Sequence, residues 1–532
     1  MDSTEIVGKL SLLIKRAKLA ADLVKRQKKA IRILAHYDAD GLTSSSIVIK
    51  ALRREGKSFH LSNIKQIRND YIEELKNSKY ELIIFLDFGS GSLEKINELE
   101  DKDVILIDHH QKQGEPGPRI IFVNPVDFGI GEDISSSGVS YLFARALDPS
   151  NKDLSEIAIV GAIGDSQIGS IGKEWGLMGI NKEILQDAVE TKKIKKTKGL
   201  RIWGRGTRPI HKALEYSLDP YIPGVSGSES KAVQFLKEIG IELKKGAEWR
   251  TLSDLSTEEE KKLASAIIIE RIHSKHENPD WIFGDIYELL DKKKVASTAN
   301  EFATMVNACG KTGKNYTGIG ICVNDLQSLE EVKKILEEYR RELGSGISWI
   351  YSNPEATIKK EHANYVLVGS KISEHLISNV ISIVSKNQDK VLFGLADADD
   401  GVKISSRCGE EDVKKGINLK EIMEASTKMF GCEGGGHKGA AGGTIPKGKE
   451  AEFISIAEGL LSSMKSVFLE DSTEKNEEEG KESNINNQTD KDYGSTETTR
   501  KGTAGRTKGT ESSSSSDSKK MERKGLVQYF GS

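Results

Sequence analysis

The chain has 532 residues, too many for a single hydrophobic core, so its length predicts two or three domains. A formal net charge of −3 excludes a protein that is basic throughout, and any surface for nucleic acid must be local. Four cysteines with no Cys-x-x-Cys pair exclude a disulfide framework and give no support for a zinc ribbon.

The first domain, residues 1–190, is predicted to begin with an amphipathic helix. Apolar residues recur at helical spacing in residues 2–32, with lysines on the other face. The chain starts without a basic segment followed by an apolar core, and no apolar run elsewhere is long enough to cross a bilayer. We therefore expect a cytoplasmic protein without a membrane partner.

Three apolar runs after this helix each end in acidic or imidazole residues. The runs are residues 31–35, 82–86 and 104–107, and a fourth run covers residues 120–123; all are typical of buried strands in a parallel sheet. The polar residues that follow the first three runs are His36, Asp38 and Asp40, then Asp87, then Asp108, His109 and His110. Ligands collect outside the carboxyl ends of the strands in an open α/β sheet. The pattern therefore predicts a doubly wound α/β domain with one shared, metal-holding pocket.

Two helices are expected to add residues to this pocket. Small hydroxyl residues, Ser44 among them, are predicted to begin an apolar helix at residues 43–46 and to leave donors free for an anion. A second apolar helix, residues 154–163, delivers Asp165. A carboxylate at the end of a buried helix is costly to desolvate without a partner, so Asp165 is the fourth acidic candidate.

Residues 191–346 are expected to form a linker and an inserted, mainly helical domain. The basic run at 192–198, with the arginines, glycines and Trp203 that follow it, fits either a solvated linker or an arm along a phosphate backbone. Helical patterns dominate from residue 209 to about residue 343, but their periodicity alone does not reveal a function.

A second α/β domain is predicted over residues 347–468. Strand patterns cover residues 365–369, 391–396 and 401–407, and the domain closes on a glycine-rich stretch at 432–443. So many glycines suit a loop that offers backbone amides to phosphate. The candidates here are Arg407, Gly434, Gly435, Gly436, His437 and Lys438. The alternatives are a flexible surface turn for His437 and an exposed strand-end arginine for Arg407.

The last residues divide into a polar segment and an apolar tip. Residues 469–523 contain too few apolar residues to offset their ordering entropy, so we expect disorder. Residues 524–532 carry Leu526, Tyr529 and Phe530 at a spacing similar to that of sliding-clamp-binding peptides, although Arg523 stands where glutamine is usual. An apolar end without function is the alternative.

The residue types in the first pocket indicate phosphoester chemistry. Carboxylates and imidazoles without thiolates favour Mn²⁺, with Mg²⁺ or Co²⁺ as alternatives, over structural zinc. Two ions about 3.5–4 Å apart would provide a hydroxide nucleophile and neutralise a phosphoryl transition state. The segment Asp38-Ala39-Asp40-Gly41 alone also fits an ordinary turn, or a haloacid-dehalogenase-type phosphatase with a nucleophilic Asp. The run Asp108-His109-His110 after a later strand argues against both.

With these residues the chain resembles the DHH phosphoesterase superfamily, and within it the archaeal RecJ-like exonucleases, also called GINS-associated nucleases. The segments similar to the four family motifs are His36-x-Asp38-x-Asp40-Gly41, Leu86-Asp87-Phe88-Gly89, Asp108-His109-His110 and Gly164-Asp165. Residues 434–442, with Ser406-Arg407 upstream, are similar to the DHH-associated domain. Stretches at 207–214, 219–224 and 302–310 resemble the archaeal branch, and the resemblance runs from about residue 31 to residue 461.

The resemblance implies two metal ions that share Asp87. His36 and Asp38 would complete the first site, and Asp40, His109 and Asp165 the second. His110 would contact the scissile phosphate or assist the leaving group, while Asp108 orients the histidines. Arg407 and the glycine loop at 434–443 would grip the phosphates of a single strand across a cleft between the two α/β domains.

These inferences predict a metal-dependent exonuclease that acts on single-stranded DNA, or on RNA, in replication or repair beside the GINS complex. One alternative is a scaffold subunit of the archaeal replicative helicase, bound to GINS, in which the chemistry is dispensable. Another is a phosphodiesterase for short oligonucleotides or cyclic dinucleotides, as in smaller DHH relatives, and the large inserted domain counts against it.

Overall fold

The computed structural model describes residues 3–464, except for 131–133, 172–173, 218–219, 275–278, 292–294, 386–387 and 389. The described residues up to Tyr339 form one compact unit, and those from Arg340 onward form a second. The predicted polar segment at 469–523 and the clamp-binding candidates Leu526, Tyr529 and Phe530 lie outside the described residues. None of the helices among the described residues is long and apolar enough to span a membrane.

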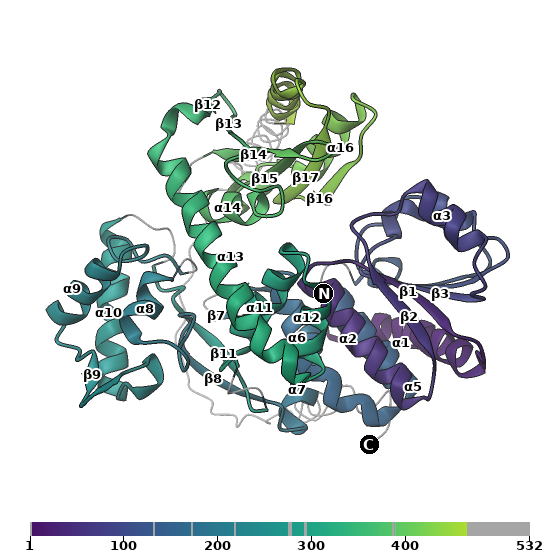
Figure 1. The fold of residues 1–532 in the computed structure, drawn as a ribbon, viewed down its shortest axis with the longest axis horizontal. Coiled ribbons are helices and arrows are strands. Elements are labelled where there is room, and N and C mark those ends of the chain that lie inside the picture. The colour runs from purple at the N-terminus through teal and green to yellow at the C-terminus, as the bar shows by residue number, and fades with distance from the viewer. Residues whose placement is uncertain are drawn as a thin grey trace, which may run out of the picture. The chain divides into compact units, whose positions relative to one another are not determined.

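The first unit is built on a five-stranded parallel sheet in the order β2-β1-β3-β4-β5 (Figure 1). Its strands are β1 (Ile31–Ala35), β2 (Phe59–Asn63), β3 (Leu82–Leu86), β4 (Asp103–Ile107) and β5 (Ile120–Val123). The strands β1 and β3 are buried along their whole length, which explains their unbroken apolar runs. The pattern did not predict β2, because this edge strand is half-exposed and carries polar residues.

The register of this sheet brings the polar segments after three strands together. Ala35 pairs with Leu86, and Leu86 pairs with Ile107, so β1, β3 and β4 end side by side. The residues that follow these strands therefore begin at one edge of the sheet, as predicted.

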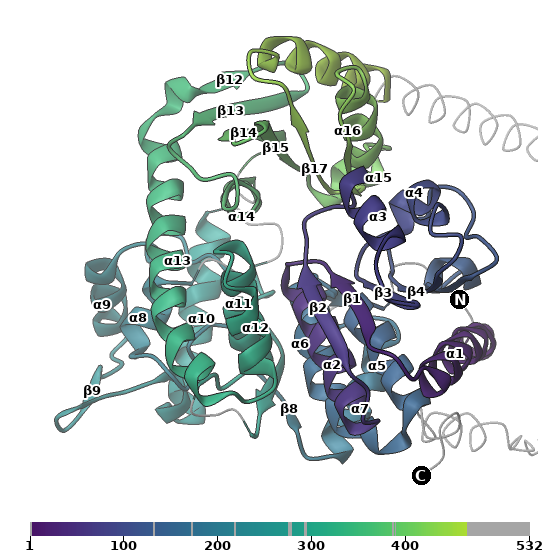
Figure 2. The same ribbon diagram turned by 45° about the vertical axis from the view of Figure 1, so that its right-hand side comes forward.

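Helices of the first unit lie beside this sheet or in a layer beyond it, where α6 packs on α2 and α5, and α7 on α6 (Figures 1 and 2). They include α1 (Ser3–Arg26), α2 (Ala39–Arg54), α3 (Asn69–Lys76), α4 (Leu93–Asn97), α5 (Ser136–Leu147), α6 (Ser155–Gly164) and α7 (Asn181–Glu190). A Cβ atom on Gly161 of α6 would clash with the hydroxyl oxygens of Thr43 and Ser137, so glycine lets α6 approach α2 and α5. The prediction that α2 begins at residues 43–46 was wrong: it begins at Ala39, because the side chain of Asp38 caps it.

The inserted region contains more strand than expected. A hairpin of β6 (Ile168–Ile171) and β7 (Glu174–Leu177) follows α6. The basic run lies mostly in β8 (Ile194–Leu200), which pairs antiparallel with β11 (Phe283–Leu289). Lysines of β8 contact acidic residues of β11, as in the 2.7 Å pair between Lys196 and Asp285. Between these strands lie α8 (Ile210–Glu215), α9 (Glu229–Glu238), β9 (Lys244–Lys245), β10 (Glu248–Trp249) and α10 (Thr257–His273).

Two helices within the predicted insert, residues 191–346, pack on the side of the first unit that carries the predicted ligands. They are α11 (Ala299–Lys311) and α12 (Asn315–Cys322), which contact α2, and α11 also contacts α6. Gly310 of α11 lies against the carbonyl group of Tyr37, where a Cβ atom would clash. Tyr37 stands between His36 and Asp38, so α11 supports the first predicted metal-binding segment.

The helix α13 (Leu326–Ser352) leads into the second unit, a six-stranded mixed sheet in the order β12-β13-β14-β15-β17-β16. Its strands are β12 (Thr357–Lys359), β13 (Ala363–Gly369), β14 (Val391–Ala398), β15 (Gly401–Arg407), β16 (Gly434–His437) and β17 (Ala440–Ile445). Its helices are α14 (Ile377–Val384), α15 (Glu410–Lys414) and α16 (Leu419–Lys428), followed by a helix at 450–464.

The glycine-rich stretch is a hairpin of β16 and β17, not the loop we expected. Part of the glycine content has a packing cause. A Cβ atom on Gly434 would lie 2.8 Å from Cγ of Met423, and one on Gly443 would lie 2.7 Å from Cγ2 of Thr427. These two glycines let α16 lie against the hairpin, whereas Gly435 has open space around it.

Candidate metal centre

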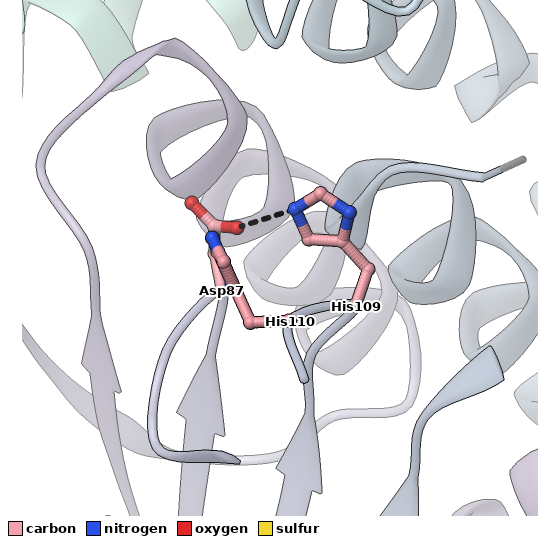
Figure 3. A group of neighbouring side chains, drawn as sticks. All are labelled: Asp87, His109 and His110. Atoms are coloured by element: carbon pink, nitrogen blue, oxygen red, sulfur yellow. Dashed lines mark ion pairs between the residues drawn. The ribbon is translucent and has the colours of Figure 1, made fainter. Parts of the chain in front are cut away.

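All six predicted metal ligands, together with the predicted catalytic residue His110, converge at the carboxyl edge of the parallel sheet. Their donor atoms fall into three groups, each within 4.8 Å: His36, Asp38 and Asp87; Asp40, His109 and Asp165; and Asp87, His109 and His110. Figure 3 shows the carboxylate of Asp87 and the ring of His109 turned toward one another beyond the strand ends.

Asp87 lies at the centre of these groups. Its Oδ2 atom is 3.6 Å from Nδ1 of His36, and its Oδ1 atom is 3.9 Å from Nε2 of His109, so its two oxygens face two different groups. The backbone of Asp87 has φ = +65°, a left-handed conformation that is costly outside glycine and that clusters at functional sites. This turn directs the carboxylate back over the ends of β3 and β4.

The carboxylate of Asp87 is buried and makes no hydrogen bond within the described part of the chain. Burial, followed by the charges of Asp38 and Asp40, raises the pKa of Asp87 well above its usual range. Burial and the same two neighbours also raise the pKa of Asp165. Several carboxylates therefore share a space in which their negative charge is not balanced by the protein.

Asp38 and Asp40 are held by the backbone at the starts of two helices. Asp38 accepts a hydrogen bond of 3.0 Å from the amide of Gly41 and lies 3.0 Å from Nδ1 of His36. Burial opposes ionisation of Asp38, but the charge of His36 lowers its pKa below the usual range. Asp40 accepts bonds of 2.7 and 2.9 Å from the amides of Ser136 and Ser137, at the positive N-terminus of α5.

Asp108 holds His110 rather than facing the other carboxylates. Its Oδ1 atom lies 2.7 Å from Nδ1 of His110 and accepts the amide of His109, and its Oδ2 atom accepts the amide of Ser90. Burial alone would lower the pKa of His110, but Asp108 raises it to about 9. The side chain of His110 is 37% exposed, and one of its ring nitrogens lies within 4.8 Å of donor atoms of Asp87 and His109.

Sequence reasoning missed four polar residues around these ligands. Asn124 donates to the carbonyl oxygen of His110 and to the hydroxyl of Ser90. Gln167 lies within hydrogen-bonding distance of Asp165 and His109, and Asn181 donates a hydrogen bond to Gln167. Asn124 directly follows the predicted fourth strand, and that position was a usable signal. No local pattern marks Gln167 or Asn181, because they meet the site only through tertiary packing.

The donor set fits divalent cations. Carboxylate oxygens and imidazole nitrogens suit Mn²⁺ or Mg²⁺, and no thiolate belongs to the three groups found among the described residues. A bound cation would give the Asp87 oxygens, which make no hydrogen bond among the described residues, a partner. Its positive charge would also favour the ionised forms of Asp87 and Asp165 and so lower their raised pKa values. His36, Asp38 and Asp87 could hold one ion, and Asp40, Asp87, His109 and Asp165 a second.

The predicted substrate-binding residues differ from one another in burial and in hydrogen-bond partners. Ser44 is fully buried in the second turn of α2 rather than at its start, so it has no surface to offer an anion. Arg407 ends β15, and hydrogen bonds to Ser382 Oγ (2.6 Å), the Ser406 carbonyl (2.7 Å) and Ser405 Oγ (3.3 Å) orient its guanidinium. No described carboxylate pairs with it, and burial lowers the pKa of Arg407 to about 10. His437 is half-buried in β16 and Lys438 is exposed in the turn that follows.

Three family models match parts of the chain. Residues 30–164 match the DHH family N-terminal domain, residues 202–280 the DHH-CID domain, and residues 361–463 the DHHA1 domain. The first match contains every predicted metal ligand except Asp165, which directly follows it.

Known proteins resemble the chain over different lengths. An uncharacterized protein of Methanocaldococcus jannaschii is 33% identical over 464 residues, which cover 86% of this chain and 99% of that protein. The single-stranded-DNA-specific exonuclease RecJ of Thermus thermophilus is 27% identical over 229 residues, 40% of this chain but only a third (33%) of RecJ.

Solved structures resemble the chain in fold. CDC45 from Entamoeba histolytica has a TM-score of 0.59 at 12% identity, covering 87% of this chain and 99% of CDC45. RecJ from Thermus thermophilus in complex with Mn²⁺ has a TM-score of 0.52 at 17% identity, covering 85% of this chain and 55% of RecJ. From its three domains and its full-length relative, the chain belongs to the DHH family and is RecJ-like.

Proposed function

We propose that this protein is a nuclease that uses two divalent ions, Mn²⁺ foremost, to hydrolyse phosphodiester bonds from an end of single-stranded DNA, with RNA as a second substrate. The observation that carries the proposal is the carboxylate of Asp87. It is buried, makes no hydrogen bond among the described residues, and presents one oxygen to the group of His36 and the other to that of His109. A protein has little reason to keep such a carboxylate unless cations occupy both sides.

The residues around Asp87 suit phosphoryl chemistry. Ions bound there would activate water and offset charge on the phosphoryl group. His110, which Asp108 keeps protonated near neutral pH, would donate a hydrogen bond or a proton to a phosphate or leaving oxygen. Arg407 would bind a backbone phosphate, because its guanidinium is oriented by three oxygens but paired with no described carboxylate.

The test is digestion of end-labelled single-stranded DNA, duplex DNA and RNA in Mn²⁺, Mg²⁺ or Co²⁺. We expect stepwise release of nucleotides from single strands, and loss of activity in Asp87→Ala. Asp101→Ala, which alters an exposed aspartate just before β4, is the matched control. Single strands that stay intact in every metal, or equal digestion by Asp87→Ala, would exclude the proposal.

The two alternative functions give different results in the same system. A short-oligonucleotide or cyclic-dinucleotide phosphodiesterase would cleave dinucleotides in preference to strands of twenty or more nucleotides. A scaffold is favoured by the fold likeness to CDC45, but that likeness concerns the fold alone, and every predicted metal ligand is present here. Binding to GINS without any metal-dependent digestion would favour the scaffold. Clamp binding through residues 524–532 stays a prediction, tested by deleting those residues.

A further inference from the structure

An amide group that no motif marks touches two of the proposed metal ligands. Gln167 directly precedes β6 and is buried, with 6% of its surface exposed. Its Nε2 atom lies 3.1 Å from Oδ2 of Asp165 and 3.4 Å from Nδ1 of His109. We infer that Gln167 is a positioning residue, which fixes the carboxylate of Asp165 and the ring of His109 for cation binding. This inference rests on the proposed function.

The rest of the chain anchors the side chain that carries this amide. Asn181, the buried first residue of α7, donates a 2.7 Å hydrogen bond to Oε1 of Gln167. The backbone amide of Gln167 donates to the carbonyl of Ala162 at 2.8 Å. Ser166, with φ = +62°, reverses the chain between Asp165 and Gln167, so both side chains reach the same place. The amide is therefore fixed from its backbone and from its far side.

The geometry explains why an amide suits this position. Nε2 of His109 faces Asp87 and Asp165, at 3.9 and 3.6 Å, so Nδ1 is the ring atom through which the protein can orient the ring. A histidine that gives one nitrogen to a metal usually donates its other N–H to a protein group. The side-chain amide of glutamine carries a donor, its NH₂ group, and an acceptor, its carbonyl oxygen. A rotation of the amide by half a turn exchanges the positions of the two. Gln167 can thus serve Nδ1 in either tautomer, whereas an apolar side chain of the same size could serve neither.

The side-chain amide of Asn181 can rotate in the same way and keep its hydrogen bond to Gln167. Its Oδ1 atom is buried and makes no hydrogen bond among the described residues. If Gln167 presents its oxygen to Nδ1–H of His109, its NH₂ group comes to face Asn181, whose free oxygen can accept it. The two amides can then rotate together. Gln167 thus orients the carboxylate of Asp165 before a cation binds, and the ring of His109 once a cation occupies Nε2 and takes the place of the N–H donor at Asp165.

The experiment measures metal binding apart from activity. Full-length protein is titrated with Mn²⁺ alone by calorimetry, and bound Mn²⁺ is followed by electron paramagnetic resonance. Gln167→Met keeps the side-chain length but removes the amide, and Asn181→Leu leaves the amide without its anchor. Gln186→Met is the matched control. It alters a glutamine of α7 whose amide donates a hydrogen bond to Glu190, away from the proposed metal ligands.

We expect one of two Mn²⁺ equivalents to bind about 10–100-fold more weakly in Gln167→Met, with an altered resonance spectrum. Asn181→Leu should weaken the same equivalent to a smaller degree, and Gln186→Met should not change it. Two equivalents that bind Gln167→Met with wild-type affinity would overturn the positioning role while leaving the proposed function intact. Wild-type protein that binds no Mn²⁺ would overturn both. A merely structural role would lower the melting temperature of the metal-free variant without changing its Mn²⁺ affinity.

Discussion

Oδ1 of Asp108 lies 2.7 Å from Nδ1 of His110, and the same oxygen accepts the amide of His109. Asp108 is fully buried, and only the imidazole edge of His110 away from it is available to a ligand. The pair therefore resembles an orienting carboxylate and a proton donor more than two metal ligands. We therefore expect Asp108 to act on the proposed chemistry through His110.

The first prediction concerns this pair. Asp108→Asn should lower kcat by about 10²–10⁴-fold, because the ring of His110 loses both its orientation and the charge that keeps it protonated. Mn²⁺ affinity should change little. Initial rates at saturating single-stranded DNA measure kcat, and a separate Mn²⁺ titration measures the metal affinity. Asp103→Asn, at the opposite end of β4, is the control; an equal loss of Mn²⁺ affinity in Asp108→Asn would mean that Asp108 supports the ligands instead.

The second prediction concerns the repulsion among the carboxylates. Asp87→Asn should stabilise the metal-free protein, because the raised pKa of Asp87 means that its charge is unfavourable there. The same variant should lose the stabilisation that Mn²⁺ gives the wild type. Urea unfolding in EDTA and in Mn²⁺ measures both effects.

The control for this variant is Asp101→Asn, which should leave both values at those of the wild type. A metal-free Asp87→Asn protein that is less stable than the wild type would show that the carboxylate is balanced by the protein. Removal of metal from the wild type with EDTA should lower its stability while leaving its fold intact, because the sheet that carries the ligands is made of buried apolar strands.

The sequence predicted the sheet and the meeting of the candidate ligands at its edge, because both depend on local patterns. The runs before His36, Asp87 and Asp108 are apolar without interruption, and parallel strands then place their ends together by geometry alone. The structure adds what depends on register and on contacts between distant segments. The orientation of Asp87, with its positive φ, and the hydrogen bonds that Asp40 accepts from amides at the start of α5 have no signature in the residues next to them.

Two features of the structure depend on contacts that the local sequence pattern could not indicate. The glycine stretch before His437 predicted a loop, because glycine is rare in strands, but Gly434 and Gly443 are there to admit α16. The helix that contains Gly310 has the same periodicity as those of the inserted domain, so the sequence could not indicate that it packs on Tyr37. Periodicity identifies a buried face but not the partner that buries it.

The third prediction concerns Arg407. Arg407→Gln should weaken binding of single-stranded DNA and reduce the slope of log affinity against log salt by about 1, because one cationic phosphate contact is lost. Its kcat at saturating substrate should stay close to that of the wild type. Fluorescence anisotropy in EDTA measures binding without cleavage. Lys403→Gln, on the same strand β15, is the control, and a salt slope unchanged by Arg407→Gln would exclude a phosphate contact.

The fourth prediction concerns the support that α11 gives to the first metal-binding segment. Gly310→Ala should destabilise the protein by about 1–3 kcal/mol, because its Cβ atom would overlap the carbonyl oxygen of Tyr37 in a packed interface. Tyr37 lies between His36 and Asp38, so relief of that overlap must move the segment that carries both ligands. Mn²⁺ affinity should therefore fall together with the melting temperature.

Gly344→Ala is the matched control, since this glycine is exposed on α13 with no neighbour within 4 Å of an added Cβ atom. Alanine should stabilise that helix by about 0.5–1 kcal/mol, because it loses less backbone entropy than glycine on folding. Opposite signs for the two substitutions would show that close packing, rather than helix propensity, fixes glycine at position 310. If Gly310→Ala lowers stability but leaves Mn²⁺ affinity unchanged, α11 stabilises the fold without positioning His36 and Asp38.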